Sequence, residues 1–263
     1  MAMRRRTRER LYRLAMYAIF VAVVGWAILA TDWPRFSKQF LNPEVAASLF
    51  PDIVTVALVN TLLYTVIGFV GGALLGILLA ILKLSSILPF RWFATAWIEL
   101  FRGLPALLTI FAVAYMLPIG LGIKIPGGPA AQGIVGLVMV ASAYMAEVIR
   151  AGIQAVPKGQ SEASRSLGMS PTKTMFWVVL PQGFRIIIPP LTNEFVLLLK
   201  DTSLIYIAGT TILSRELTTF ARDSSSATAN GTALVVAAAL YLIVTIPLTR
   251  LAAWLERRLA RQR

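Results

Sequence analysis

The stretch AGIQAVPKGQSEASRSLGMSPTKTMFWVVLP, residues 151–181, decides the fold of this chain. It is polar and charged, although long apolar stretches precede and follow it. Pro157 is expected to end the preceding segment, and Ser161 is expected to cap a short helix with Glu162 in its first turn. Gly168 is expected to end that helix in a left-handed conformation. The sequence therefore predicts about two turns of helix between two membrane-length segments.

The composition is that of a membrane protein. Apolar residues make up 57% of the 263 residues and charged residues only 14%, and a helix needs about 20 apolar residues to cross a bilayer. Six segments qualify: Leu14–Thr31, Ile53–Leu82, Phe93–Leu117, Gln132–Ile149, Gly183–Ala208 and Thr232–Leu251. We therefore expect an all-α, polytopic helical membrane protein. Its membrane domain spans 53–251 with the polar loop at 151–182, between an N-terminal anchor segment (1–52) and a basic tail (252–263).

The net charge of +13 is unevenly distributed. If Met1 lies inside, most Lys and Arg residues fall on the inner ends and inner loops. The outer loops then carry only five: Arg35, Lys38, Lys124, Arg215 and Arg222. This asymmetry follows the positive-inside rule and predicts that both termini are cytoplasmic. The basic tails are then explained by anionic lipid, and no nucleic-acid partner is expected.

The chain contains no cysteine and no histidine. Disulfides, thiol chemistry, imidazole acid–base catalysis and the usual zinc and haem ligands are therefore excluded. No catalytic residue and no metal site are expected. A Gly-x-x-x-x-Gly-Lys-[Ser/Thr] phosphate loop is also absent from the sequence, so any ATP must be bound by another chain.

Ionisable residues inside the predicted spans mark a candidate substrate site, because such residues are costly in a membrane. Glu194 and Asp201 are seven residues apart and share a helix face. Counting from Gly183 places Glu194 about 16 Å deep, and counting from Phe93 places Arg102 about 14 Å deep. A zwitterionic amino acid needs a cation for its carboxylate and an anion for its ammonium group. Arg102 with Glu194 or Asp201 supplies both.

A purely structural role for these charges is the alternative. In that case Arg102, Glu99 and Glu194 pair with one another and hold helices together. Farther along the chain, Pro189 and Pro190 remove two backbone donors, so we expect the helix to break or kink there. A broken helix at membrane depth is tolerated only when it is buried in protein or lines a cavity, which points to a pathway.

Two further patterns predict helix contacts. Gly68, Gly72 and Gly76 form overlapping G-x-x-x-G motifs, which let another helix approach closely. Glu147 and Arg150 are expected to form an i,i+3 ion pair at the cytoplasmic boundary, where the polar loop begins.

The polar loop resembles the EAA loop of permease subunits of bacterial ABC importers. The matching residues are Glu162-Ala163-Ser164, Gly168 and Leu180-Pro181. In that family the loop forms a coupling helix that docks into a cleft on the ATPase subunit. The resemblance therefore implies an ATPase-coupling role for four residues: Glu162, Ala163, Ser164 and Gly168.

Two other segments look like those of permeases of the polar amino acid importer subfamily, which includes histidine, glutamine and glutamate systems. They are Phe101-Arg102-Gly103-Leu104-Pro105 and Asn193-Glu194…Lys200-Asp201-Thr202-Ser203. The resemblance implies a type I ABC importer fold, with Arg102, Glu194 and Asp201 around a substrate site near the bilayer centre. Two features depart from the subfamily: Leu104 stands where Thr is common, and an extra span precedes a core that often has five.

The resemblance also implies the setting in which the chain works. The expected partners are a second permease subunit, identical or related, two ATP-binding subunits and an extracytoplasmic substrate-binding protein. The chain itself needs no cofactor, because ATP is bound by the partner subunit. The expected location is the plasma membrane of a bacterium.

Two rival functions follow from the same composition. An ion-driven secondary amino acid transporter would be expected to show inverted repeats, which are not evident, and it leaves the polar loop unexplained. A membrane enzyme would need nucleophiles, acid–base groups or metal ligands that this sequence lacks. Co-purification with a stoichiometric ATPase would distinguish the importer from both.

Overall fold

The computed structural model describes residues 5–123 and 125–260. This part of the chain is all-α and contains no strand. Arg4, Lys124, Arg261 and Arg263, which count among the basic residues that predict the topology, lie outside the described residues. The α-helices, in order, are α1 (Arg5–Ala30), α2 (Trp33–Phe40), α3 (Pro43–Ser48), α4 (Val59–Leu84), α5 (Leu88–Gly103), α6 (Ala106–Phe111), α7 (Leu117–Gly120), α8 (Gly128–Gln154), α9 (Lys158–Ser166), α10 (Pro171–Thr174), α11 (Leu180–Asp201), α12 (Leu217–Thr228) and α13 (Thr232–Ala260).

Five helical stretches among the described residues are long and apolar enough to span a membrane. They are Glu9–Ala30, Ile53–Leu84, Gly128–Gln154, Pro171–Ala208 and Thr232–Leu259. Short π-helical segments precede α4 and α11 and extend them without a break. A sixth span results if α5 and the segment Ala106–Gly120 are counted together, although the two are bent by 111°. The prediction of an all-α polytopic membrane protein is confirmed.

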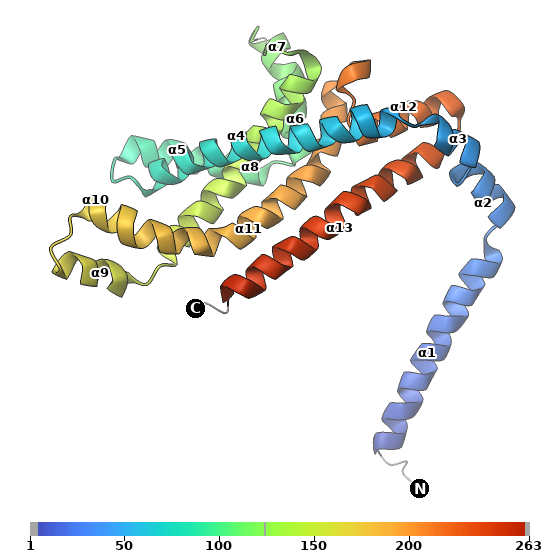
Figure 1. Ribbon diagram of the computed structural model, residues 1–263, viewed down its shortest axis with the longest axis horizontal. Helices are drawn as coiled ribbons and strands as arrows, with labels where there is room; N and C mark the ends of the chain where they lie inside the picture. The colour runs from blue at the N-terminus through green and yellow to red at the C-terminus, as the bar shows by residue number, and fades with distance from the viewer. Residues whose placement is uncertain (1–4, 124, 261–263) are drawn as a thin grey trace.

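The centre of the bundle is the contact between α4 and α8 (Figure 1). The G-x-x-x-G glycines make this contact possible. A Cβ atom added at Gly72 would lie 2.7 Å from the Cβ of Ala141, and one at Gly76 would lie 3.1 Å from the backbone oxygen of Ser142. Larger side chains would therefore force the helices apart, and the predicted close approach is confirmed.

The predicted third span, Phe93–Leu117, is sharply bent. α5 ends at Gly103 and α6 begins at Ala106, with the 111° bend between them. Leu104 is extended (φ −92°, ψ 142°), which is the conformation imposed on a residue that precedes proline, here Pro105. Arg102 lies in α5, directly before the bend, and its depth in the membrane stays a prediction.

A break or a kink was predicted at Pro189 and Pro190, and the helix does not break there. α11 continues through both prolines as one helix. Packing holds the segment in place, since Ile187 is buried in a cluster with Ala80 and Ile149. A Cβ at Gly152 of α8 would lie 2.0 Å from the Cγ2 of Ile187, so the two helices are as close as they can be. Here tertiary contacts override a local preference.

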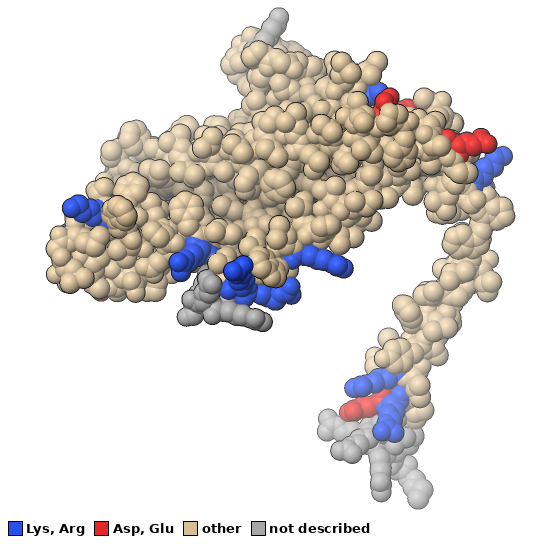
Figure 2. All heavy atoms as spheres, viewed as in Figure 1, with Lys and Arg blue, Asp and Glu red and all other residues tan. Residues whose placement is uncertain are grey.

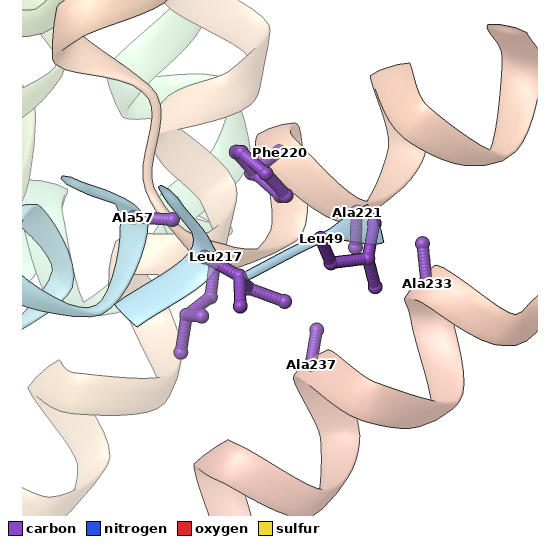
Figure 3. Packing of buried hydrophobic residues seen from close by; sticks show 8 residues of the cluster. Leu49, Ala57, Leu217, Phe220, Ala221, Ala233 and Ala237 are labelled. Carbon is purple, nitrogen blue, oxygen red and sulfur yellow. The ribbon is translucent and has the colours of Figure 1, made fainter. Parts of the chain in front are cut away.

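A separate apolar cluster closes the opposite end of the bundle from the polar loop. Figure 3 shows side chains from three regions of the chain pointing toward one another: Leu49, Ala57, Leu217, Phe220, Ala221, Ala233 and Ala237. All are buried. The cluster therefore fixes α12 against the start of α13 and the segment that leads into α4.

The first helix, α1, stands apart from the bundle (Figure 1). None of the most apolar stretch of its span is buried by the rest of the described chain. In Figure 2, Lys and Arg side chains gather at the start of α1 and along the edge near α9 and the end of α13. The acidic side chains seen beside α2, α3 and α12 lie at the opposite end.

Candidate functional site

The carboxylates of α11 lie on one face, as their spacing predicts. Glu194 and Asp201 are both partly buried, whereas Asn193 and Lys200 are exposed. Asp201 is close enough to act on Glu194 electrostatically. Asp201 is also the last residue of α11, and the chain continues in a 3₁₀-helix, Thr202–Ala208. The two carboxylates thus mark the final two turns before the helix changes type.

Arg102 reaches the same region from α5. Its side chain is exposed, and its guanidinium carbon lies 5.7 Å from the centre of the Tyr144 ring on α8. Arg102 also acts on Glu194 electrostatically. Within the described residues, however, it forms no ion pair with Glu194 or with Glu99. The structure brings Arg102 near Glu194 without joining them.

The polar loop forms the predicted short helix, α9, but with a different start. Pro157 is the N-cap residue, α9 begins at Lys158, and no side chain caps it. The predicted Ser161 cap is therefore wrong, and Glu162 lies in the middle of the helix rather than in its first turn. Proline is tolerated at this position because the N–H group that it lacks would have no partner inside the helix, and its restricted φ fits the extended conformation of the N-cap (φ −56°, ψ 131°).

The end of α9 is as predicted. Gly168 has φ +86°, in the left-handed region that favours glycine. The N–H of Met169 donates to the carbonyl of Ser164 (3.1 Å), and the N–H of Gly168 donates to that of Arg165 (3.0 Å). This pair of bonds is a Schellman motif, which satisfies the last carbonyls of the helix.

The four predicted coupling residues do not share one environment. Glu162, Ala163 and Gly168 are exposed, whereas Ser164 is buried. The Ser164 hydroxyl donates to the carbonyl of Ser161 (2.9 Å) and lies 3.0 Å from the hydroxyl of Thr174 on α10. Ser164 therefore ties α9 to α10, while the other three face outward.

An ionic cluster lies just before the loop. The predicted pair of Glu147 and Arg150 is present, and Lys83 of α4 joins it, with its ammonium nitrogen 3.2 Å from a Glu147 oxygen. Arg150 also donates to Gln154 at the end of α8. The part played by Lys83 was missed, because sequence spacing does not reveal partners on another helix.

Glu216 was not predicted as a special residue, yet its side chain is fully buried. Its carboxylate accepts hydrogen bonds from the N–H groups of Thr218 (2.6 Å) and Thr219 (2.7 Å) and from the hydroxyl of Thr219 (2.5 Å). It is thus the N-cap of α12. Burial raises the pKa of Glu216, and these hydrogen bonds counteract the rise. Glu is not among the residues preferred at an N-cap, so the local sequence carries no clear signal for this one.

No group of three or more potential metal ligands occurs among the residues that the structure describes. The candidate site therefore consists of charges, hydrogen-bonding groups and an outward-facing loop. Those groups can bind a charged small molecule and contact a second protein.

Comparison with known proteins adds three findings. Residues 72–261 match the family model of the binding-protein-dependent transport system inner membrane component. The chain is 38% identical over 203 residues to the probable glutamine ABC transporter permease protein GlnM of Bacillus subtilis, covering 76% of this chain and 90% of that protein. It is 33% identical over 209 residues to the glutamate/aspartate import permease protein GltK of Escherichia coli, covering 77% and 92%.

A solved structure is similar as well. The crystal structure of an amino acid ABC transporter with histidines matches with a TM-score of 0.74 and 34% identity. The match covers 82% of this chain and 98% of that one. The likeness therefore includes nearly all of the solved permease chain.

Proposed function

The chain belongs to the family of binding-protein-dependent transport system inner membrane components, and we propose that it carries a polar amino acid past Arg102 and Glu194. It is a permease subunit of an ATP-driven amino acid importer and a multi-pass inner membrane protein. Its family is a non-catalytic one. This membership supports ATP-driven transport over the ion-driven alternative.

The observation that carries the substrate assignment is the separation of Arg102 from Glu194. Two opposite charges in a membrane bundle are expected to pair unless something else comes between them. Here Arg102 is exposed and Glu194 is partly buried, with no ion pair between them in the described chain. A bound amino acid would satisfy both: its carboxylate beside Arg102, its ammonium group beside Glu194 and Asp201.

The coupling assignment rests on the surface of the loop. Glu162 and Ala163 are exposed on α9, and Gly168 ends that helix. Leu167, at the C-cap, is 84% exposed, which is costly for an apolar side chain in water unless a partner covers it. An ATP-binding subunit is the proposed partner, and ATP is bound there because this chain has no phosphate loop.

The proposed assembly contains a second permease subunit, two ATP-binding subunits and an extracytoplasmic substrate-binding protein. The proposed transport domain is 53–251, with 1–52 and 252–263 as flanking segments. Within the first flanking segment α1 stands apart from the bundle, whereas α2 and α3 contact α13, and α13 continues past the second boundary. Both termini are proposed to be cytoplasmic, because basic residues gather at the start of α1 and near the end of α13.

The test is uptake by the purified complex in proteoliposomes. Labelled histidine, glutamine, glutamate and arginine are supplied with the binding protein, with and without ATP, and with and without sodium or proton gradients. We expect one or more of them to accumulate only when ATP is hydrolysed. Accumulation driven by an ion gradient through this chain alone would contradict the assignment.

A further inference from the structure

The short helix α2 has two chemically opposite faces. Trp33, Phe36 and Phe40 lie at helical spacing and stack on one another, with ring centres 5.9 Å and 5.3 Å apart. Arg35 and Lys38 lie on the other side of the helix, given 3.6 residues per turn. The described chain buries no residue of α2. An aromatic face of this kind, left uncovered, needs a partner.

The position of α2 restricts what that partner is. It begins three residues after Ala30, where the apolar helix α1 ends. None of the most apolar stretch of α1 is buried by the chain, so lipid surrounds that stretch in the membrane. The indole N–H of Trp33 donates to the carbonyl of Ile28 (2.8 Å). The aromatic face of α2 therefore follows directly on the lipid-covered surface of α1, at the end of that helix.

The other end of α2 is fixed to the bundle. The side chain of Gln39 donates to the carbonyl of Ala229 (2.7 Å), and the N–H of Gly231 donates to the carbonyl of Gln39 (2.9 Å). The side chain of Asn230 donates to the carbonyl of Lys38 (3.0 Å). A Cβ atom at Gly231 would lie 2.5 Å from the Phe40 ring, so only glycine fits beneath it. These contacts place α2 at a fixed height beside the turn between α12 and α13.

We propose that α2 lies in the outer interface of the bilayer and binds phospholipid. Trp33 and Phe36 rest at the boundary between headgroups and acyl chains, where aromatic rings are most stable. Arg35 and Lys38 face the headgroup phosphates and water, as charge complementarity requires. The helix thus braces the turn Ala229–Thr232 against the membrane surface. This proposal does not depend on which substrate the importer carries.

The test uses the absence of cysteine from the chain. Single cysteines replace Phe36 or, as the matched control on the opposite face, Lys38, and each carries a spin label in the assembled complex. The complex is reconstituted in vesicles of phosphatidylethanolamine and phosphatidylglycerol. We expect the label at residue 36 to collide with oxygen, which concentrates in lipid, more often than the label at residue 38 does. The label at residue 38 should collide more often with a water-soluble nickel chelate than the label at residue 36 does.

Equal exposure of both labels to nickel would overturn the proposal. Protection of residue 36 only after addition of the substrate-binding protein would also overturn it and would make that protein the partner. Because Phe36→Cys removes a ring contact, a second measurement uses the complex with its native α2. Brominated phospholipid should quench the tryptophan fluorescence of the unsubstituted complex by a larger fraction than that of a Trp33→Phe variant. The same quenching in both would show that Trp33 is not in lipid.

Discussion

The hydroxyl oxygens of Ser164 and Thr174 lie 3.0 Å apart in a buried contact that joins α9 to α10. Ser164 is the third residue of Glu162-Ala163-Ser164, the segment that resembles the EAA loop, yet its side chain is buried. Its proposed part in coupling is to hold the shape of the loop whose outer surface its neighbours form.

Replacing Ser164 by Ala should loosen the loop. The change leaves the Thr174 hydroxyl without this partner, at a cost of about 1–3 kcal/mol for a buried polar group. Tryptic cleavage after Arg165 and Lys173 should become faster in the assembled complex. Ser166→Ala is the control, since the Ser166 hydroxyl is exposed and bonds only within α9. Equal cleavage rates in the two variants would contradict a shape-holding role.

Gly168→Ala should weaken the coupling of substrate to ATP hydrolysis. An alanine at φ +86° is strained by roughly 1–2 kcal/mol, so the end of α9 must shift. Gly159→Ala is the matched control, because Gly159 lies inside α9 and a Cβ there also meets open space. Substrate-stimulated ATP hydrolysis in proteoliposomes is the measurement. A loss of similar size in both variants would indicate that the methyl group, and not the backbone conformation, matters.

Glu194→Gln should lower uptake per assembled complex while the complex still forms. The variant keeps the shape of the side chain and removes the charge proposed to hold the ammonium group of the substrate. Since Glu194 has no ion pair with Arg102 in the described chain, the change leaves no broken salt bridge. Glu99→Gln, on the exposed surface of α5, is the control and should transport normally. A Glu194→Gln complex that dissociates would favour the structural alternative instead.

The topology can be tested with introduced cysteines. Cysteine at Lys173 in the polar loop should be protected from an impermeant thiol reagent added outside cells. Cysteine at Ser226 on α12 should react with it. Both positions are exposed in the structure, so a difference in labelling reports the side of the membrane. The reverse pattern would place 151–182 outside and 32–52, 119–131 and 210–231 inside, and would remove the coupling assignment.

Stability should depend on pH through Glu216. Its folded-state pKa is raised by burial above the ordinary value of 4.5. Its contribution to stability is therefore fully present below pH 4.5 and is lost as pH rises through the higher folded-state pKa. Glu216→Gln should flatten this part of the thermal-unfolding profile of the detergent-solubilised complex. A variant with the same pH dependence as the unsubstituted protein would assign the change to another group.

Much of the fold was predictable because apolar length and glycine spacing act locally. The long apolar segments, the left-handed Gly168 and the close helix approach at Gly72 all follow from single stretches of sequence. The start of α9 was misplaced because Pro157, which was expected only to end the preceding segment, is itself the N-cap, four residues before Ser161.

The errors arose where distant parts of the chain decide the outcome. Pro189 and Pro190 were expected to break a helix that packing at Ile187 keeps intact. Phe93–Leu117 was expected to form one span, yet the chain bends by 111° between α5 and α6. Similarly, Lys83 gains its role from Glu147, which is 64 positions away in sequence. In the candidate site, residue types were predictable, whereas the distance between Arg102 and Glu194 was not.

The unbroken course of α11 has a mechanical consequence. Helical structure runs from Pro171 to Ala208 as one span, so continuous helix connects the polar loop to the two carboxylates. At 1.5 Å per residue, α11 alone is about 33 Å long. A displacement at the loop end of α11 is therefore expected to reach Glu194 and Asp201, because no break in the helix separates them from the loop. Arg102 lies on α5, beside the bend at Pro105, and not on α11. A movement of α11 would therefore change the position of Glu194 relative to Arg102.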